Sequence, residues 1–240
     1  MDVPINGITM KLTECAQGSY LRIQSETPLR TLNSSPWGGG FGSHTNLINR
    51  QVDRFYQAAD PIGEMNTFLA EEGIDSHVTA SMLTAAKVKH VGFSSLCWEE
   101  AAQVELSTHG DSRERLQVAS WVTVGLGNKA RAGAELPASS LYPGTINSIV
   151  IINGLLTDAA MVNAVITATE AKTAALQALG IKVGGAFATG TTTDAVLIAA
   201  TGRGRLLSYA GTATQLGYLI GRTVYEAVMA SGNVYEEKPY

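Results

Sequence analysis

The chain has 240 residues, a net charge of −4 at neutral pH and only 16% charged residues. It therefore lacks the basic surface that nucleic acids need, and no apolar run approaches the roughly 18 residues of a membrane span. The first residues carry no basic or apolar leader pattern, and Cys15 and Cys97 lack metal-ligand spacing. We expect a reduced, cytoplasmic protein that binds neither nucleic acid nor membrane. Because so little of the surface is charged, we also expect a homo-oligomer.

The N-terminal part alternates apolar and polar residues over 5–13 and 20–24, on either side of Gln17-Gly18-Ser19. This pattern predicts a β-hairpin. Residues 30–44 follow and include Gly38, Gly39 and Gly40 before His44. Three consecutive glycines favour a flexible loop over a helix or a well-packed strand. Such a loop could approach a ligand closely or could simply be a mobile surface loop, and His44 could belong to a site or be an ordinary buried or surface histidine.

The middle of the chain contains one clear helix and several strands. Asp60-Pro61 predicts a helix start, and the helix should end near Gly73. Strands are expected over 78–86, 91–96 and 116–124, with a polar surface loop over 108–115. The segment 123–133 then ends a strand and presents Asn128 and Arg131. This segment is either part of a site or a turn with surface charge.

The second half begins with a buried strand over 145–156, where Asn147 and Asn153 will both need hydrogen-bond partners. Thr157 is the expected N-cap of a long helix that Gly180 ends. Three polar side chains share one side of this helix, namely Asn163, Thr167 and Glu170. Lys172 lies roughly on the opposite side. The stripe is either the solvent face or a buried polar surface near a site. A last helix is expected from Thr212, followed by a frayed tail over 232–240.

The stretch 189–202 places four threonines and Asp194 before the apolar run 195–200. The run predicts a buried strand, and the hydroxyl-rich segment predicts a turn that leads into it. Asp and Thr side chains in such a turn can satisfy backbone N–H groups, or they can form a polar site. Across the chain, strands outnumber helices and hairpins dominate the first half. We predict a single α+β domain over 1–240, with a mixed, mostly antiparallel sheet or sheets layered with helices, rather than a doubly wound parallel sheet.

Several motifs resemble the adenosylcobinamide amidohydrolases of corrinoid salvage. They lie at residues 144–147, 161–176, 188–194, 209–214 and 219–222, with further likeness in the Gly-rich segments 37–42 and 125–133. The resemblance extends from about residue 28 to 230. It implies hydrolysis of the amide that joins aminopropanol to the corrin ring of adenosylcobinamide, which yields adenosylcobyric acid and 1-amino-2-propanol.

Amide hydrolysis needs a base, an oxyanion stabiliser and a proton for the leaving amine. Asp194 and Glu170 are the candidate bases, and Thr191, Thr192 and Thr193 are candidate oxyanion donors or, as a second choice, nucleophiles. The candidate substrate-binding residues are Gly38, Gly39, Gly40, His44, Asn128, Arg131, Asn147, Asn153 and Asn163. With no metal-ligand spacing, we expect no cofactor and no metal among the site residues, in a reaction that is either metal-free or loosely assisted by a metal. Two alternatives stay open: a corrinoid storage or delivery protein without hydrolysis, and a self-processing enzyme with a threonine nucleophile.

Overall fold

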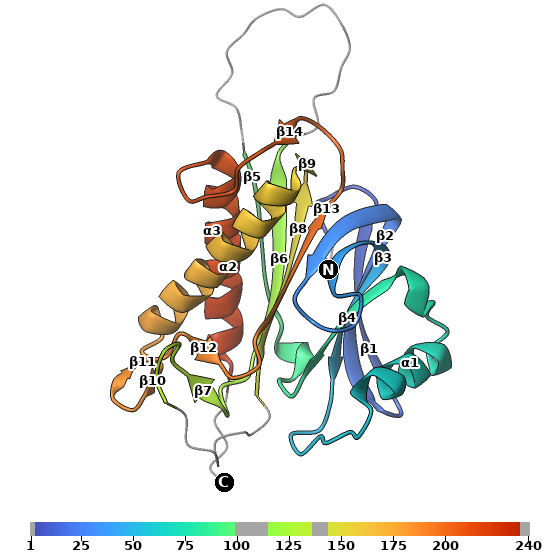
Figure 1. Ribbon diagram of the computed structural model, residues 1–240, viewed down its shortest axis with the longest axis vertical. Coiled ribbons are helices and arrows are strands. Elements are labelled where there is room, and N and C mark those ends of the chain that lie inside the picture. Colours follow the sequence, from blue (N-terminus) through green and yellow to red (C-terminus); the bar gives the residue numbers. More distant parts are fainter. Residues whose placement is uncertain (1–2, 99–114, 136–143, 236–240) are drawn as a thin grey trace, which may run out of the picture.

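The computed structural model describes residues 3–98, 115–135 and 144–235. It confirms an α+β fold built on one mixed sheet of eight strands (Figure 1). The strands of this sheet are β1 (Ile8–Cys15), β2 (Gly18–Asn33), β3 (Gly40–Gln51), β4 (Thr79–Thr84), β5 (Gly92–Cys97), β6 (Gln117–Val124), β8 (Ile146–Asn153) and β13 (Ala195–Ala200). The helices are α1 (Pro61–Glu71), α2 (Asp158–Ala178) and α3 (Gln215–Asn233), with 3-10 turns η1 (Ser76–Val78) and η2 (Val88–His90).

The sheet runs in the order β4-β3-β2-β13-β8-β6-β5, and β1 pairs with β2. The pairs β3–β4 and β13–β8 are parallel, and the other pairs are antiparallel. Parallel strands cannot be joined by a hairpin, and α2 provides the crossover from β8 to β13. Three further two-stranded pairings are β7 (Lys129–Ala130) with β12 (Gly190–Thr191), β9 (Leu155–Leu156) with β14 (Leu206–Leu207), and β10 (Lys182–Val183) with β11 (Ala186–Phe187).

The sheet bends so that its two halves pack against each other. Along β8, Ile149 and Ile151 belong to a core shared with Leu47 of β3, whereas Val150 and Ile152 belong to the core under α2 and α3. Successive side chains of a strand point to opposite faces, so the middle of β8 and of β13 is a continuous apolar run because both faces are covered. β2 is 16 residues long, and its pairing with β3 shifts register between Gln24 and Leu29. Such irregularities bend strands, which explains how the first half folds over the second.

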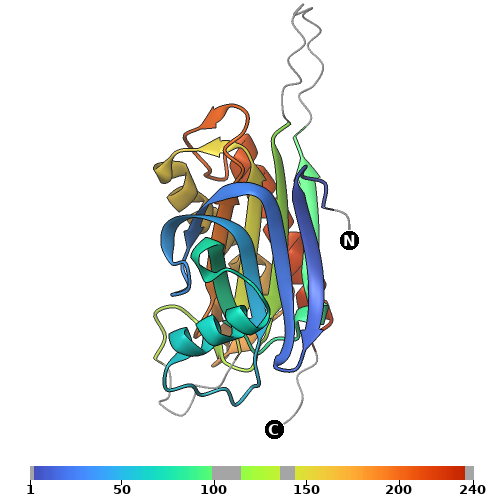
Figure 2. The ribbon, with the colours of Figure 1, turned by 90° about the vertical axis from the view of Figure 1, so that its right-hand side faces the viewer.

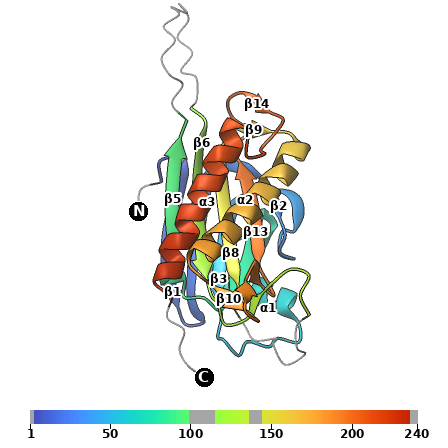
Figure 3. The ribbon, with the colours of Figure 1, turned by 90° about the vertical axis from the view of Figure 1, so that its left-hand side faces the viewer.

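Helices cover both outer surfaces of this folded sheet. Figures 1 and 3 show α2 and α3 side by side on the β13-β8-β6-β5 half. Figure 2 shows α1 on the other half, where Phe68 packs with Tyr20 and Ile48. The predicted helix starts are confirmed for α1 and α2, since Asp60 accepts from Gly63 N and Thr157 accepts from Ala160 N. None of the described helices is long and apolar enough to cross a membrane.

Two predicted elements need correction, and a third falls mainly outside the described residues. Gly40 to Gly42 form the start of β3 rather than a flexible loop, because Gly40 pairs with Asn33 and its φ of 73° suits glycine. The last helix is capped by Thr214, not Thr212, since the Thr214 hydroxyl accepts from the backbone of Gly217. This helix also continues to Asn233, so the tail was predicted to begin too early. The predicted loop over 108–115 falls mainly outside the described residues.

The buried position of His44 predicts that the stability of the fold depends on pH. This residue is 8% exposed, and its Nδ1 lies 2.7 Å from the Thr31 hydroxyl oxygen. Burial lowers the pKa of His44 below its ordinary value of 6.5. The unfolded chain therefore takes up this proton at higher pH than the folded chain does, and stability is lost as the pH falls through 6.5. We expect His44→Gln to flatten this part of the pH profile of urea unfolding. His77→Gln, at an exposed position, should leave the profile unchanged, and an identical profile for His44→Gln would contradict the prediction.

Candidate active site

The candidate site is centred on Asp194, immediately before β13. Because β13 pairs in parallel with β8, Asp194 lies next to the start of β8, and its Oδ1 accepts from the backbone of Ile146 at 3.1 Å. The same oxygen accepts from the backbone N–H of Thr191 at 3.1 Å and from the Thr191 hydroxyl. A carboxylate is thus held in one orientation, with a hydroxyl group directly against it.

Lys172 completes this cluster from α2, and sequence reasoning did not identify it. Its ammonium group forms an ion pair with Asp194 Oδ2, and the side chains of Lys172 and Asp194 are 8% and 13% exposed. Gly190 permits this approach. A Cβ added at Gly190 would overlap Asp194 Oδ2 and lie 2.7 Å from Lys172 Nζ. The geometry therefore explains why glycine occupies position 190.

The other predicted threonines lie in the same turn. Thr192 accepts a hydrogen bond from the side-chain amide of Asn128, and its backbone N–H donates to Asn128 O at 3.3 Å. Thr193 is exposed, and its hydroxyl donates to Gly144 O at 2.8 Å. The short pairing of β7 with β12 places Thr191 opposite Lys129. The turn, β7 and the start of β8 therefore form one polar region at a single edge of the sheet.

Asn128 is 4% exposed and leaves an unused acceptor beside this region. Its Oδ1 has no hydrogen-bond partner among the residues that the structure describes. Asn128 packs against Gly144, where an added Cβ would lie 3.1 Å from Gly127 N and closer still to Asn128 Oδ1. Asn128 is therefore fixed by backbone packing, with its amide directed at the threonine turn.

Asn147 directly follows Ile146 on β8 and belongs to a buried hydrogen-bond network. Its amide donates to Asn49 Oδ1 and to Leu83 O, both at 2.8 Å, and Asn49 in turn donates to Thr123. These groups sit between the two halves of the sheet, where Asn147 is 1% exposed. The partners that a buried asparagine requires are thus present, and Asn147 holds the two halves together.

The predicted stripe on α2 does not join the Asp194 cluster. Asn163 accepts from the backbone N–H of Ala210 at 3.0 Å, and Thr167 donates to the carbonyl of the same residue at 2.8 Å. Glu170 is exposed and lines a groove between α2 and α3. Asn153 lies at the other end of β8, where it contacts Arg115 O and Thr201. The structure therefore separates these residues from Asp194.

The Gly-rich turn and Arg131 lie at the edge of the sheet that holds Asp194. Ser34, just after β2, donates its N–H to Val196 O, and its hydroxyl accepts from Val196 N at 2.9 Å. The turn with Gly38, Gly39 and Gly40 follows directly, whereas His44 is turned inward onto Thr31. Arg131 is exposed and donates to Phe187 O at 2.8 Å, on the β10–β11 hairpin. Within the described ranges, no three His, Cys, Asp or Glu side chains are grouped so that they could hold a metal ion.

The layered fold has a counterpart among solved structures. The PH0078 protein of Pyrococcus horikoshii superposes with a TM-score of 0.51 over 95% of this chain and 84% of that chain, at 12% sequence identity. This likeness shows an α+β fold of the same general class. A family model for adenosylcobinamide amidohydrolase matches residues 6–239. The chain belongs to the adenosylcobinamide amidohydrolase family, which confirms the resemblance seen in the sequence.

Curated relatives agree with this membership. An adenosylcobinamide amidohydrolase of Halobacterium salinarum is 40% identical over 120 residues, which are 48% of this chain and 49% of that protein. One of Methanosarcina mazei is 25% identical over 82% of this chain and 87% of its own length. An uncharacterized protein of Methanocaldococcus jannaschii is 31% identical over 68% of this chain and 66% of its own. The chain thus matches about half of the Halobacterium salinarum protein and about two thirds of the Methanocaldococcus jannaschii protein. The family name indicates an enzyme that acts on an amide.

Proposed function

We propose that this protein hydrolyses the aminopropanol amide of adenosylcobinamide to give adenosylcobyric acid and 1-amino-2-propanol, in salvage of cobalamin precursors. Membership of the family supports the substrate class. The observation that carries the proposal is the continuous chain of contacts from the Thr191 hydroxyl through Asp194 to Lys172. A nucleophile, a base within hydrogen-bond reach and a third group that orients the base form the arrangement used in nucleophilic catalysis.

The geometry favours Thr191 as the nucleophile, because its hydroxyl donates directly to Asp194. In the first step Thr191 Oγ1 bonds to the amide carbon while its proton passes to Asp194. The C–N bond then breaks, the leaving amine takes the proton from Asp194, and an ester to Thr191 remains. In the second step Asp194 takes a proton from a water molecule as the water attacks the ester. The acid is released, and the Thr191 oxygen regains its proton.

Thr192 and Asn128 supply the stabilisation of the oxyanion in this account. The Thr192 oxygen accepts from Asn128, so its own proton is left to donate to the developing negative charge on the substrate oxygen. Lys172 is a positioning residue that acts through Asp194. Exposed Arg131 and the turn at residues 38–40 lie at the same edge, where they can contact the amide side chains of a corrinoid.

Incubation of the purified protein with adenosylcobinamide tests the proposal. We expect a new acidic corrinoid and an equimolar amount of 1-amino-2-propanol, both measured by mass spectrometry. The Thr191→Val variant is the matched control, since it keeps the shape of the side chain and removes the hydroxyl. Tight binding without product would contradict the proposal and support a storage or delivery protein. Cleavage of the chain before a threonine, seen by intact mass, would support self-processing instead.

A further inference from the structure

The outer surface of α2 is more apolar than a solvent-exposed helix requires. Its inner side contributes Ala164, Ala168 and Leu176 to the core, yet Val162 and Ile166 on its outer side remain 48% and 50% exposed. Figure 3 shows that α2 and α3 form the outermost layer on this side of the molecule. A helix that is apolar nearly all round is normally covered on both sides. Among the residues that the structure describes, nothing therefore covers Val162 and Ile166 on the outer side of α2.

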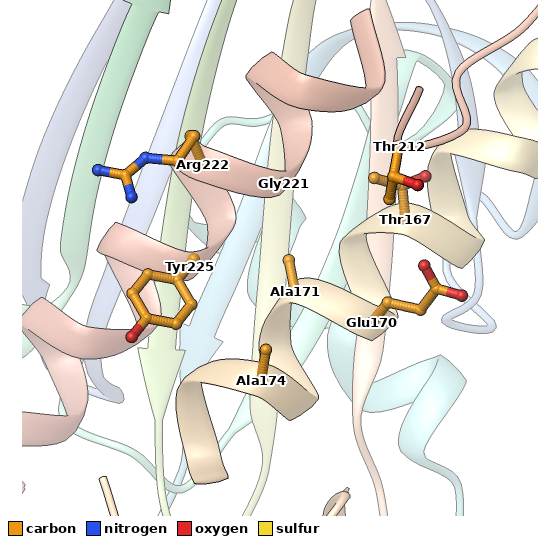
Figure 4. Close-up of a pocket in the computed structure, with 8 residues that line it drawn as sticks. All are labelled: Thr167, Glu170, Ala171, Ala174, Thr212, Gly221, Arg222 and Tyr225. Atoms are coloured by element: carbon orange, nitrogen blue, oxygen red, sulfur yellow. The ribbon is translucent and has the colours of Figure 1, made fainter. Parts of the chain in front are cut away.

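A groove of about 390 Å³ runs between α2 and α3 on this surface. Figure 4 shows its floor of small side chains, Ala171 and Ala174 from α2 with Gly221 from α3, beside the ring of Tyr225. A Cβ added at Gly221 would meet no atom within 4 Å. Small residues allow another surface to approach the helices closely, so the groove is shaped to receive a ridge of side chains.

Opposite charges flank the groove. Glu170 projects from α2 and Arg222 from α3, and Figure 4 shows them pointing to opposite sides of the apolar floor. Arg222 forms an exposed ion pair with Glu226 one turn along α3, with Arg222 52% exposed. A two-fold axis along the groove would place α2 of each copy over α3 of the other. Glu170 of each copy would then lie on the Arg222 side of its partner, at two equivalent places.

We propose that this α2–α3 face, defined by Val162, Ile166, Glu170, Gly221 and Arg222, is a two-fold interface between two copies of the chain. The proposal goes beyond amide hydrolysis and does not depend on it. Symmetric dimers use one self-complementary patch on both subunits. An apolar groove with Glu170 on one side and Arg222, itself paired with Glu226, on the other provides such a patch. The Asp194 cluster lies under the other side of α2, where Lys172 reaches it, so the interface leaves the candidate active site free.

Sedimentation and light scattering of the full chain test this interface. The wild type should have twice the chain mass of 25.3 kDa. Arg222→Glu should weaken the dimer by at least about tenfold, because it opposes Glu170 twice in a symmetric interface. The double variant Glu170→Arg with Arg222→Glu should restore association, since a positive side chain at position 170 again opposes a negative one at position 222. Ile166→Asp should also weaken the dimer.

Arg54→Glu provides the matched control, because it makes the same charge change at an exposed position after β3. Arg54→Glu should leave the dissociation constant of the dimer unchanged. The replaced side chains are exposed, and thermal melts by circular dichroism check that each variant is folded. The interface is rejected if the wild type is monomeric at all concentrations. It is also rejected if Ile166→Asp and Arg222→Glu both leave a dimer intact, or if the charge exchange fails to recover what Arg222→Glu loses.

Discussion

Replacement of Asp194 by Asn should lower kcat for adenosylcobinamide hydrolysis by about 10²–10⁴-fold, the range expected when a general base is removed. The amide of Asn cannot take the proton of the Thr191 hydroxyl. Thr191→Val should cause a similar loss, and the double variant should lose little more, because groups that act as a unit are not additive. Thr191→Ser should keep measurable turnover. Steady-state kinetics with each variant provides the measurement.

Glu170→Gln tests the competing carboxylate, and it should retain turnover because Glu170 lies in the α2–α3 groove rather than at the threonine turn. Wild-type turnover in Asp194→Asn together with loss in Glu170→Gln would reverse the assignment of the base. Loss in Thr191→Val with none in Asp194→Asn would point to a different base. Binding of the substrate by Asp194→Asn, measured by titration of corrinoid absorbance, separates lost chemistry from lost affinity.

Replacement of Lys172 by Met should lower the free energy of unfolding by about 3–5 kcal/mol, because removal of one partner leaves a buried charge on the other. We expect the lower end of this range, since Asp194 keeps its hydrogen bonds from Ile146 and Thr191. The double variant Lys172→Met with Asp194→Asn should recover most of the loss, because it removes both charges. Urea unfolding of the four proteins completes the double-mutant cycle.

The double variant also serves the kinetic experiment. If it is as stable as the wild type yet inactive, then removal of the Lys172–Asp194 pair abolishes activity without unfolding the chain. Equal stability of Lys172→Met and the wild type would contradict the buried ion pair. A double variant less stable than either single variant would contradict the coupling between Lys172 and Asp194.

Much of the fold was predictable because the buried positions of strands and helices are apolar and regularly spaced in the sequence. β13 and β8 are apolar runs because both faces of each strand are covered, and Asp60 and Thr157 mark helix starts through their own hydrogen bonds. The bend of the sheet was not predictable. It depends on the register shift between Gln24 and Leu29, which shows only in the pairing of β2 with β3. The glycines at 38–40 predicted flexibility, although the structure uses them for a turn and the start of β3.

The candidate site was predictable only in part. Asp194 and the three threonines are neighbours in sequence, so their grouping follows from the turn itself. Asn128 joins them through the β7–β12 pairing, which two-residue strands do not reveal in advance. The helical spacing placed Lys172 opposite the polar stripe of α2. That position was the signal in the sequence that could have identified Lys172 as part of the site. A single lysine on the side of an apolar helix that faces the sheet requires a buried acidic partner, and Asp194 is that partner.

A structure of the Thr191→Val variant with bound adenosylcobinamide tests the central claim most directly. The variant keeps the Asp194–Lys172 pair and cannot form the ester, so the intact amide should be trapped. We predict that the amide carbon lies within van der Waals contact of the valine side chain at position 191, with the carbonyl oxygen within hydrogen-bond distance of Thr192. An amide bound in the α2–α3 groove, or at the far end of β8 near Asn153, would contradict the account.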